Sequence, residues 1–300
     1  MKPFLAGACW TFSESLAAVR QKDKWGYIDR EGYFVIPPQF TDAEGFSEGL
    51  AVVEKNEKYG YIDKNGTFVI APQFEYANSF TEGVAIVFVD GKHHIIDKQG
   101  HTLVTLADTI TDVEPFSDGL ATIVIDWKYG YVNHEGKMVI PLQFDFAGPF
   151  VDGLAEVEIE DKCGLIDKSG NFVVPVQYDD ADYFSEGVMP VRIDGQWRFV
   201  DGHGNTLAIL GDKYDTVVCL MEGRASVLAN HKHGAIDKSG NLVIDIRFDE
   251  LGYFSEGLAY ARIGNTHGFV NPSGEFELQR PVPQRTLLDR LLGRNWNLQW

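Results

Sequence analysis

The sequence has few cysteines and few basic residues, and each shortage excludes a class of protein. Only Cys9, Cys163 and Cys219 are present among 300 residues, an odd and widely spaced set that does not form a disulfide framework. Lys and Arg total 26 against 44 Asp and Glu, which gives a formal net charge of −18. Such a chain lacks the basic face with which proteins bind nucleic acid or anionic membranes.

Long apolar runs are missing as well. No window approaches the ~18 apolar residues that cross a bilayer. Residues 5–9 faintly resemble a lipoprotein cleavage site, but the apolar stretch before Cys9 is shorter than a secretion signal requires. We therefore expect a cytoplasmic protein with neither a nucleic-acid nor a membrane partner.

The remaining composition is that of a folded protein organised in repeats. Hydrophobic residues make up 44% and aromatic residues 13% of the chain, which is enough to form a core. A pattern of Phe, any residue, an acid and usually Gly, followed by an apolar run, recurs at intervals of 34 or 36 residues. We divide the chain into a leader (1–11), eight repeats (12–45, 46–79, 80–115, 116–149, 150–183, 184–219, 220–253 and 254–278) and a basic tail (279–300).

Each repeat has the pattern of short antiparallel strands joined by tight turns. In the repeat 46–79, the apolar run 50–53 is followed by the run 58–62, by Asp-Lys-Asn-Gly at 63–66 and by a third apolar run. Asp-Lys-Xaa-Gly between two such runs predicts a hairpin, because Asp accepts backbone N–H bonds inside the turn and Gly supplies a positive φ. We expect three strands in each repeat and a fourth, short strand near residues 74–77.

One such repeat cannot bury its apolar face alone, so neighbouring repeats have to stack. A closed β-propeller would achieve this, but 34 residues is short for a four-stranded blade of ~40–45 residues. The repeats 80–115 and 184–219 are both two residues longer than the others, and both lack the aromatic-Gly pair and the Pro-Gln-Phe turn. A period of three repeats does not fit a whole number of times into a ring of eight. The sequence thus favours an all-β, solenoid-like superhelical array with three units in each turn, and the closed propeller is the alternative.

The repeats resemble a known family. Residues 24–29 (Lys-Trp-Gly-Tyr-Ile-Asp) and 46–51 (Phe-Ser-Glu-Gly-Leu-Ala) are similar to the bacterial WG (KWG) repeat family, and the resemblance extends from residue 12 to about residue 278. Trp precedes Gly in this form only at Trp25, and the residues in its place elsewhere are Tyr59, Tyr129, Cys163, His233 and His267. The resemblance implies a β-rich repeat architecture and an interaction role. It implies no common catalytic activity, cofactor or ligand.

The acids of the recurring Phe-Xaa-acid-Gly turn are the first candidate interaction residues. Identical repeats would place these acids in a row, and such an acidic ridge would attract a basic protein or a cation in a salt-dependent manner. The alternative is that each acid caps the amides of its turn. The candidates are Glu48, Glu82, Asp118, Asp152 and Glu186.

Tryptophans outside the strict repeat pattern are the second set of candidates. Trp127 stands where other repeats have a polar residue or Gly, at an expected hairpin tip, and an exposed indole there would anchor a partner. Trp197 lies in the variant repeat 184–219, and Trp296 and Trp300 lie in the tail. Burial against an adjacent repeat is the alternative for these side chains.

No motif indicates catalysis, a metal or a cofactor. The Asp-Lys-Xaa-Gly turns lack the alternating acids of an EF-hand, and no nucleophile elbow, zincin helix, Walker loop or dinucleotide fingerprint is found. His231 and His233 would share one face of a strand, as half of a metal site would require. Because His233 occupies the aromatic position of the repeat, we expect it to pack against a neighbour instead.

The tail differs from the repeats in charge. Between 279 and 300 it has four Arg and one Asp, a net charge of +3. Residues 286–292 have the pattern of a short amphipathic helix with Thr286 as its N-cap and Gly293 after its end. We expect this helix to cap the last repeat, and the alternative is a basic arm that binds a partner or the acidic body.

Together these features favour a non-enzymatic scaffold that presents an extended acidic surface to another protein, one with a basic surface. Two alternatives remain open. A glycan-binding module would show exposed Trp and Tyr beside carboxylates in several repeats, and a hydrolase with an unrecognised acidic site would show one deep pocket with perturbed carboxylates.

Overall fold

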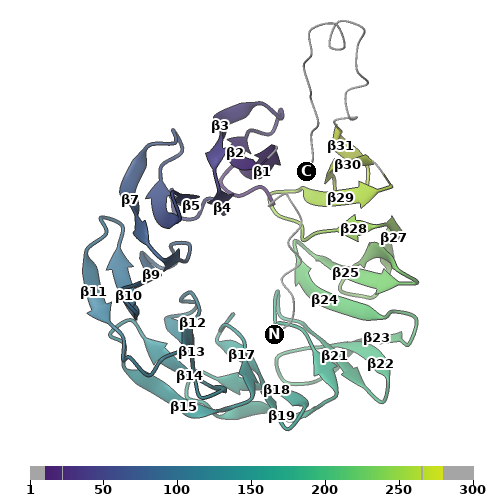
Figure 1. Ribbon diagram of the computed structural model, residues 1–300. Helices are drawn as coiled ribbons and strands as arrows, with labels where there is room; N and C mark the ends of the chain where they lie inside the picture. The colour runs from purple at the N-terminus through teal and green to yellow at the C-terminus, as the bar shows by residue number, and fades with distance from the viewer. Residues whose placement is uncertain (1–10, 22, 265, 280–300) are drawn as a thin grey trace, which may run out of the picture.

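The computed structural model describes residues 11–21, 23–264 and 266–279. Throughout these segments the regular elements are β-strands, which form eight small antiparallel sheets. The sheets follow one another around a ring, so that the last lies beside the first (Figure 1). The chain is therefore a closed eight-bladed β-propeller. The expectation of an open superhelical array with three units per turn is wrong, and the alternative of a closed propeller is correct.

The predicted helix at residues 286–292 lies outside the described residues. Within them there is no helix that could cross a bilayer.

Each sheet is one blade, and its strands run in chain order from the middle of the ring outwards (Figure 1). Blade 1 has three strands within the described residues and the other blades have four. The strands are β1 (Ala17–Gln21), β2 (Lys24–Ile28) and β3 (Phe34–Phe40) in blade 1; β4 (Asp42–Ala43), β5 (Ala51–Lys55), β6 (Lys58–Ile62) and β7 (Phe68–Phe74) in blade 2; β8 (Tyr76–Ala77), β9 (Val84–Val89), β10 (Lys92–Asp97) and β11 (Thr102–Thr105) in blade 3; β12 (Asp112–Val113), β13 (Leu120–Ile125), β14 (Lys128–Asn133) and β15 (Met138–Phe144) in blade 4; β16 (Phe146–Ala147), β17 (Leu154–Ile159), β18 (Lys162–Asp167) and β19 (Phe172–Tyr178) in blade 5; β20 (Asp180–Ala181), β21 (Met189–Ile193), β22 (Gln196–Val200) and β23 (Thr206–Gly211) in blade 6; β24 (Thr216–Met221), β25 (Arg224–Ala229), β26 (Lys232–Ile236) and β27 (Leu242–Phe248) in blade 7; and β28 (Glu250–Leu251), β29 (Ala259–Ile263), β30 (Thr266–Val270) and β31 (Phe276–Gln279) in blade 8.

Four strands fit into 34 residues because the innermost strand and the turn between the central strands are both short. The innermost strand has only two residues in most blades, as in β4. The central strands are joined by two-residue turns, such as Asn56 and Glu57 between β5 and β6, where φ is 56° and 63°. Two consecutive positive φ values define the type I′ turn, which matches the twist of a hairpin. The length of the repeat is therefore compatible with a full blade.

The fourth short strand expected near residues 74–77 is present, but it belongs to the next blade. β8 pairs with β9 of blade 3, whereas β7 pairs with β6 of blade 2. Each repeat thus contributes three strands to one blade and the innermost strand to the following one. This offset links adjacent blades through the chain itself.

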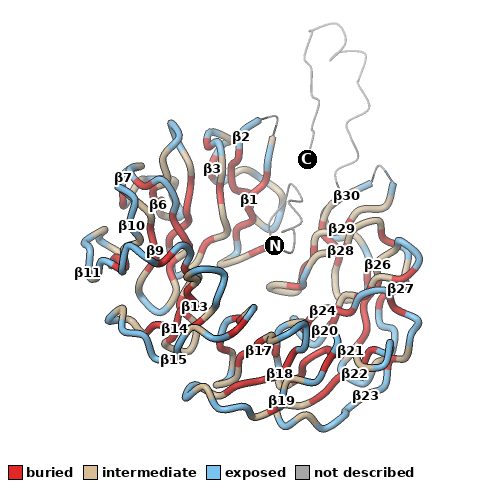
Figure 2. The backbone as a smooth tube through the Cα atoms, turned by 60° about the horizontal axis from the view of Figure 1, so that its bottom comes forward, coloured by how far each residue is buried: buried red, intermediate tan, exposed pale blue. Residues whose placement is uncertain are grey.

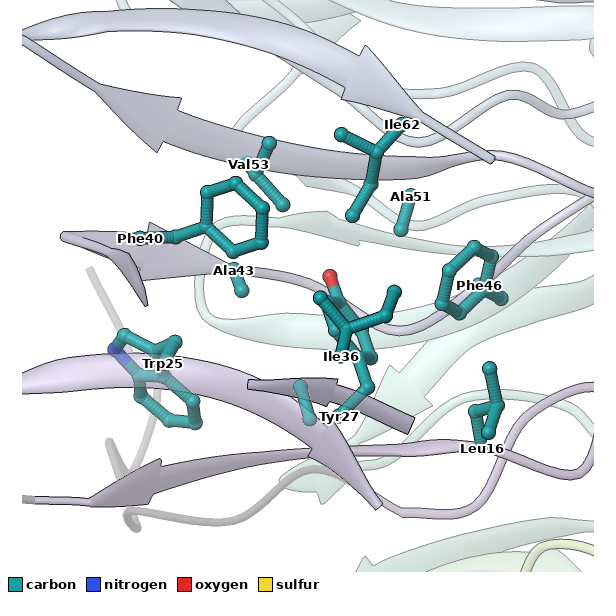
Figure 3. Close-up of a cluster of buried hydrophobic side chains, with 11 residues drawn as sticks. Leu16, Trp25, Tyr27, Ile36, Phe40, Ala43, Phe46, Ala51, Val53 and Ile62 are labelled. Atoms are coloured by element: carbon teal, nitrogen blue, oxygen red, sulfur yellow. The ribbon is translucent and has the colours of Figure 1, made fainter. Parts of the chain in front are cut away.

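The core lies between the blades. A separate cluster of buried side chains occupies each boundary, and Figure 3 shows the one between blades 1 and 2, where Tyr27 and Ile36 face Phe46 and Ile62. Buried residues follow the strands, and exposed residues lie mainly at turns and outer strands (Figure 2). Because a sheet needs a partner for its apolar face, this arrangement makes every blade depend on two neighbours.

The boundary between blades 8 and 1 closes the ring. Phe12, Val19 and Ile28 of blade 1 pack with Leu258 and Phe269 of blade 8. The ring centroids of Phe12 and Phe269 are 4.8 Å apart. An open array of eight units has seven boundaries, so the presence of an eighth distinguishes the ring from the solenoid.

The glycine of the Trp-Gly motif allows the outer strand to pass close by. A Cβ atom on Gly60 would lie 2.7 Å from the carbonyl oxygen of Ile70 and 2.7 Å from the nitrogen of Pro72. The outer strand bulges here, since Tyr59 and Tyr61 pair with residues four apart. Any side chain at this position would displace the bulge.

Blades 3 and 6 have His94 and Arg198 in place of this glycine, and their outer strands, β11 and β23, follow a more regular ladder. Figure 1 places these two strands on opposite sides of the ring. The variation at the third and sixth repeats therefore concerns the outer strand of each blade. It does not describe the rotation from one blade to the next. Variation at every third repeat therefore does not indicate three units in each turn.

Candidate functional site

The order of the strands places the connections of every blade on two opposite faces of the ring. The turn face carries the Phe-Xaa-acid-Gly turns, which join the first strand of a blade to the second, and the Asp-Lys-Xaa-Gly turns, which join the third to the fourth. The hairpin face carries the two-residue tips that join the second strand to the third. The candidate acids lie on the turn face and Trp127 lies on the hairpin face.

The turn-face acids bind neighbouring blades. The carboxylate of Glu48 accepts the N–H of Gly83, in the equivalent turn of the next blade, at 3.0 and 3.2 Å. The expected capping of turn amides is present, but across the blade boundary instead of within one turn. The same bond joins Glu14 to Gly49, Glu82 to Gly119, Asp118 to Gly153, Glu186 to Gly223 and Glu222 to Gly257.

Asp152 is the exception among the eight described turns, because its carboxylate does not accept a hydrogen bond from the N–H of Gly187. Glu256 completes the series at the ring closure. Its carboxylate accepts the N–H of Ser15 in blade 1 at 3.1 and 3.2 Å and pairs with the Arg30 guanidinium at 2.7 Å.

Cations of the Asp-Lys-Xaa-Gly turns approach the same carboxylates. Lys98 of blade 3 lies 3.2 Å from Glu48 of blade 2, and Lys64 of blade 2 lies 3.0 Å from Glu14 of blade 1. Although burial acts in the opposite direction, the Lys64 ammonium and the Gly49 N–H hold the pKa of Glu14 below its usual value. These contacts give the turn-face acids a role in joining blades. An acidic ridge that binds a partner remains a prediction.

Trp127 lies at the tip between β13 and β14, as the sequence predicted. Its side chain is 85% exposed. Asp126 and Trp127 have φ values of 50° and 63°, so both stand in the left-handed region. This region costs roughly 1–2 kcal/mol for a residue with a side chain. A large apolar side chain is therefore held in water, on a strained backbone, at a place where Gly91 and Gly195 stand in blades 3 and 6.

The Trp127 tip is also less tied to its surroundings than the tips that follow it. In blade 5, Asp145 accepts the N–H of the tip residue Glu160 at 2.9 Å and pairs with Lys128 of blade 4. Blade 4 has Thr111 at the position of Asp145, and its hydroxyl donates to the Val124 carbonyl at 2.9 Å. A carboxylate that fixes the tip in blade 5 is thus replaced in blade 4 by a hydroxyl bound to the strand.

The other candidate tryptophans are not on the described surface. Trp197 is 2% exposed and packs with Phe199, Leu210 and Tyr214 between blades 6 and 7. The expectation of an exposed contact at Trp197 is therefore corrected to a core position, because Trp197 takes the motif's aromatic place on β22. Trp296 and Trp300 lie outside the described residues.

The sequence analysis missed a cluster at the middle of the ring, which we call the inner rim: Glu44, Tyr76, Glu114, Tyr183 and Tyr253. The three tyrosines are 48%, 41% and 45% exposed. Burial, followed by Glu44 and Glu114, raises the pKa of Tyr76 to about 12, so side chains from blades 2, 3 and 4 act on one another.

Carboxylates of the inner rim also titrate abnormally. Burial raises the pKa of Glu44, which the hydroxyl of Ser79 opposes and the charge of Asp42 supports. Burial and then Asp112 raise the pKa of Glu114, although that side chain is exposed to solvent. Phenol rings beside carboxylates can hold a cation.

Variation between repeats is the signal that could have revealed the inner-rim residues other than Tyr76, which lies four places before Phe80. Residues one or two places before the opening Phe differ from repeat to repeat, while the turn that follows is nearly constant. The differing positions are Glu44, Asn78, Glu114, Gly148 and Asp182, followed by Gly45, Ser79, Pro115, Pro149 and Tyr183.

No metal centre is apparent in the part of the chain that the structure describes. No three His, Cys, Asp or Glu side chains gather there as a metal ion would require. The small pocket between blades 7 and 8 is lined by residues such as Arg224, Ser226 and Leu251, and it contains no carboxylate. His231 stands at a hairpin tip, and burial lowers the pKa of His233.

Two comparisons relate the chain to known proteins. Among solved structures, it is similar to a crystal structure of the eukaryotic initiation factor (10% identity, 91% of this chain and 87% of that chain, TM-score 0.63). It is also similar to Hsv2 of Kluyveromyces lactis (9% identity, 78% of this chain and 90% of that chain, TM-score 0.50). At these identities the likeness shows the fold alone. None of the curated proteins compared with the chain matches it.

The sequence itself matches the model of the WG containing repeat in six segments. They are residues 8–25, 25–59, 59–92, 129–163, 164–197 and 234–266, and together they cover more than half of the chain. The unmatched stretch 93–128 contains most of the third repeat, where His93 and His94 replace the aromatic-Gly pair. The chain therefore belongs to the WG-repeat family.

Proposed function

We propose that this WG-repeat propeller is a non-enzymatic scaffold whose hairpin face binds another protein through Trp127. WG repeats and β-propellers are commonly protein-interaction scaffolds, which supports the class of function. The exposed indole of Trp127 supports the hairpin face as the binding surface.

The observation that carries the proposal is the cost of Trp127 to the fold. An 85% exposed indole forms no core, and its φ of 63° favours Gly or Asn over Trp. Tryptophans of this kind are typical anchors of protein interfaces, where a few aromatic residues contribute most of the binding free energy. Binding of a partner explains a residue that folding does not.

The surroundings of Trp127 suggest the chemistry of the partner. Asp126 shares the tip, and the neighbouring tip in blade 5 is formed by Glu160 and Asp161. With a net charge of −18, the chain favours a protein with an apolar pocket surrounded by basic groups over nucleic acid or anionic lipid. We keep the cytoplasm as the expected location.

The two alternatives receive less support. A repeated glycan site would place an exposed Trp or Tyr at equivalent tips of several blades, whereas the other described tips carry Asn, Asp, Glu, Gly and His. A hydrolase with an acidic site of the glycosidase type would need two carboxylates on either side of the bond that it cleaves. The carboxylates with raised pKa values, Glu44 and Glu114, belong to different blades, and each is raised mainly by burial.

The test is protein capture from a lysate of the native host with three immobilised chains: the wild type, W127A and E57A. Glu57 occupies the same position of the blade 2 tip with a φ of 63°, so E57A is a matched control. We expect a protein retained by the wild type and by E57A to be lost with W127A, since removal of an anchor of about 2 kcal/mol weakens binding about 30-fold. Equal retention by all three chains would contradict the role of Trp127.

A further inference from the structure

The outer strand of blade 6, β23, differs from the other outer strands in how its free edge is protected. β23 is the last strand of the sheet β20-β21-β22-β23 and pairs only with β22 among the described strands. Such an edge presents unpaired N–H and C=O groups along the strand. Most proteins protect these edges with proline, charge or bulges, because a second strand could otherwise add to them.

The regular blades carry these protections. In β7, residues 71–73 bulge opposite Gly60, and Pro72 removes one N–H from the strand. The same wide bulge occurs in β3, β15, β19 and β27. Proline is present in the first three of these strands, and β27 has Asp245 and Arg247 instead.

β23 has neither proline nor charge, and it lacks the wide bulge of the regular blades. Its sequence is Thr-Leu-Ala-Ile-Leu-Gly, without proline or charge. Arg198 and Phe199 of β22 pair with the consecutive residues Ile209 and Ala208, so the wide bulge is missing, and only single-residue register shifts remain, at Leu207 and Leu210. Ile209 is 69% exposed and Leu207 is 46% exposed. The residues aligned with Ile209 in blades 1 to 5 and 7 are Pro37, Ala71, Thr105, Pro141, Pro175 and Asp245.

Blade 3 provides an internal comparison. β11 also lacks proline and the wide bulge, but it has only four residues, and Thr105 stands where β23 has Ile209. The Thr105 hydroxyl bonds to the His94 ring at 3.0 Å. An edge that is both long and apolar is therefore found at β23 and not at β11.

We infer that β23 is a strand-addition site at which two copies of this chain pair, β23 against β23, in antiparallel orientation. A free ladder of N–H and C=O groups fits an extended polypeptide strand. Antiparallel pairing around a two-fold axis joins β23 of one copy to β23 of the other. With the axis at Ala208, Leu207 of each copy lies opposite Ile209 of the other, so that four exposed aliphatic side chains meet where the two strands pair. Because β23 has no charge, two chains of net charge −18 meet there without like charges across the ladder.

The test is the molar mass of the full chain in solution, measured by sedimentation between about 1 and about 100 µM, the range in which a small edge-to-edge dimer would be populated. We expect the wild type to rise from 33.5 kDa towards twice that mass. Because the dimer contains position 209 twice, I209K should weaken association at least about tenfold. V69K is the matched control, since Val69 is 47% exposed on the bulged strand β7 and the change in charge is identical. It should associate like the wild type.

A second measurement identifies the strand directly. Amide hydrogen exchange of residues 206–211 should slow as the protein concentration rises, while exchange of residues 68–74 should not change. A wild type that stays at 33.5 kDa would overturn the proposal and leave the edge to a strand of a different polypeptide. An I209K chain with wild-type far-UV circular dichroism and wild-type association would overturn it equally.

Discussion

The two faces of the ring are built from the same repeats, yet they use their polar residues differently. On the turn face, seven of the eight acids accept an N–H from the next blade, and one of these seven is Glu256, which accepts the N–H of Ser15 across the ring closure. On the hairpin face, the tip residues vary, and Trp127 projects into water at one blade. The comparison indicates that positions repeated in every unit stabilise the ring, whereas departures from the repeat are available for binding.

The largest expected effect is at the aromatic residues that begin the turns. Phe12 is fully buried between blades 1 and 8. F12A should lower the free energy of unfolding by about 3–5 kcal/mol, the usual cost of removing a buried phenyl ring. W127A, which removes a larger but exposed side chain, should lower it by less than about 0.5 kcal/mol. Urea unfolding measures both free energies. A similar loss of stability in the two variants would contradict the distinction between residues that recur in every repeat and residues that differ from the repeat pattern.

A smaller effect is expected at the turn-face carboxylates. E48A removes the bond to Gly83 and the pair with Lys98, and it should cost about 1 kcal/mol. D152A is the matched control, because the structure records no equivalent bond there, and it should cost less than about 0.5 kcal/mol. Equal stabilities of the two variants in urea would show that the bonds between blades contribute nothing.

The hairpin face should respond in the opposite direction. W127G relieves the left-handed strain and should raise the free energy of unfolding by about 0.5–1 kcal/mol while it removes the proposed anchor. E57G, at the same place in blade 2, should gain a similar amount and keep partner capture. Thermal unfolding measures the gain. A W127G chain less stable than the wild type would mean that the indole supports the fold.

The pH dependence distinguishes the turn face from the inner rim. The folded pKa of Glu14 lies below its ordinary 4.5, so its ionised form adds stability above about pH 4.5 that is lost as the pH falls through the folded pKa. E14Q should therefore be less stable than the wild type at pH 7, and the difference should vanish in acid.

Burial raises the pKa of Glu44, so ionised Glu44 opposes folding at neutral pH, and E44Q should be more stable than the wild type at pH 7. This gain should also disappear as the pH falls below the ordinary value of 4.5. Urea unfolding at both pH values measures the two differences. The same sign for both variants at pH 7 would contradict the assigned environments.

Much of the blade could be predicted from the sequence, because its cues are local. The Asp-Lys-Xaa-Gly turn, the apolar runs and the hairpin tip at Trp127 all depend on neighbouring residues. Closure could not be predicted in this way, since it depends on the angle between sheets and on contacts such as Phe12 with Phe269, 257 residues apart. The assumption that 34 residues is too short failed because the innermost strand of most blades needs only two residues.

The candidate residues show the same division. Trp127 departs from its own local pattern, so the sequence revealed it. Trp197 occupies the position that Trp25, Tyr59 and Tyr129 have in other blades, and only the cluster between blades 6 and 7 shows that it is buried. The inner rim joins Glu44, Tyr76 and Glu114 from three blades, and this grouping requires knowledge of the ring.

The closed ring is tested most directly by a zero-length carbodiimide cross-link across its last boundary. R30K gives blade 1 the same residue that blades 2 and 3 have in this turn, where Lys64 lies 3.0 Å from Glu14 and Lys98 lies 3.2 Å from Glu48. We predict an intramolecular amide between position 30 and Glu256, found by mass spectrometry in the monomeric fraction together with the Lys64–Glu14 and Lys98–Glu48 links. If those two links form and the link from position 30 to Glu256 does not, blades 8 and 1 do not meet and the ring is open.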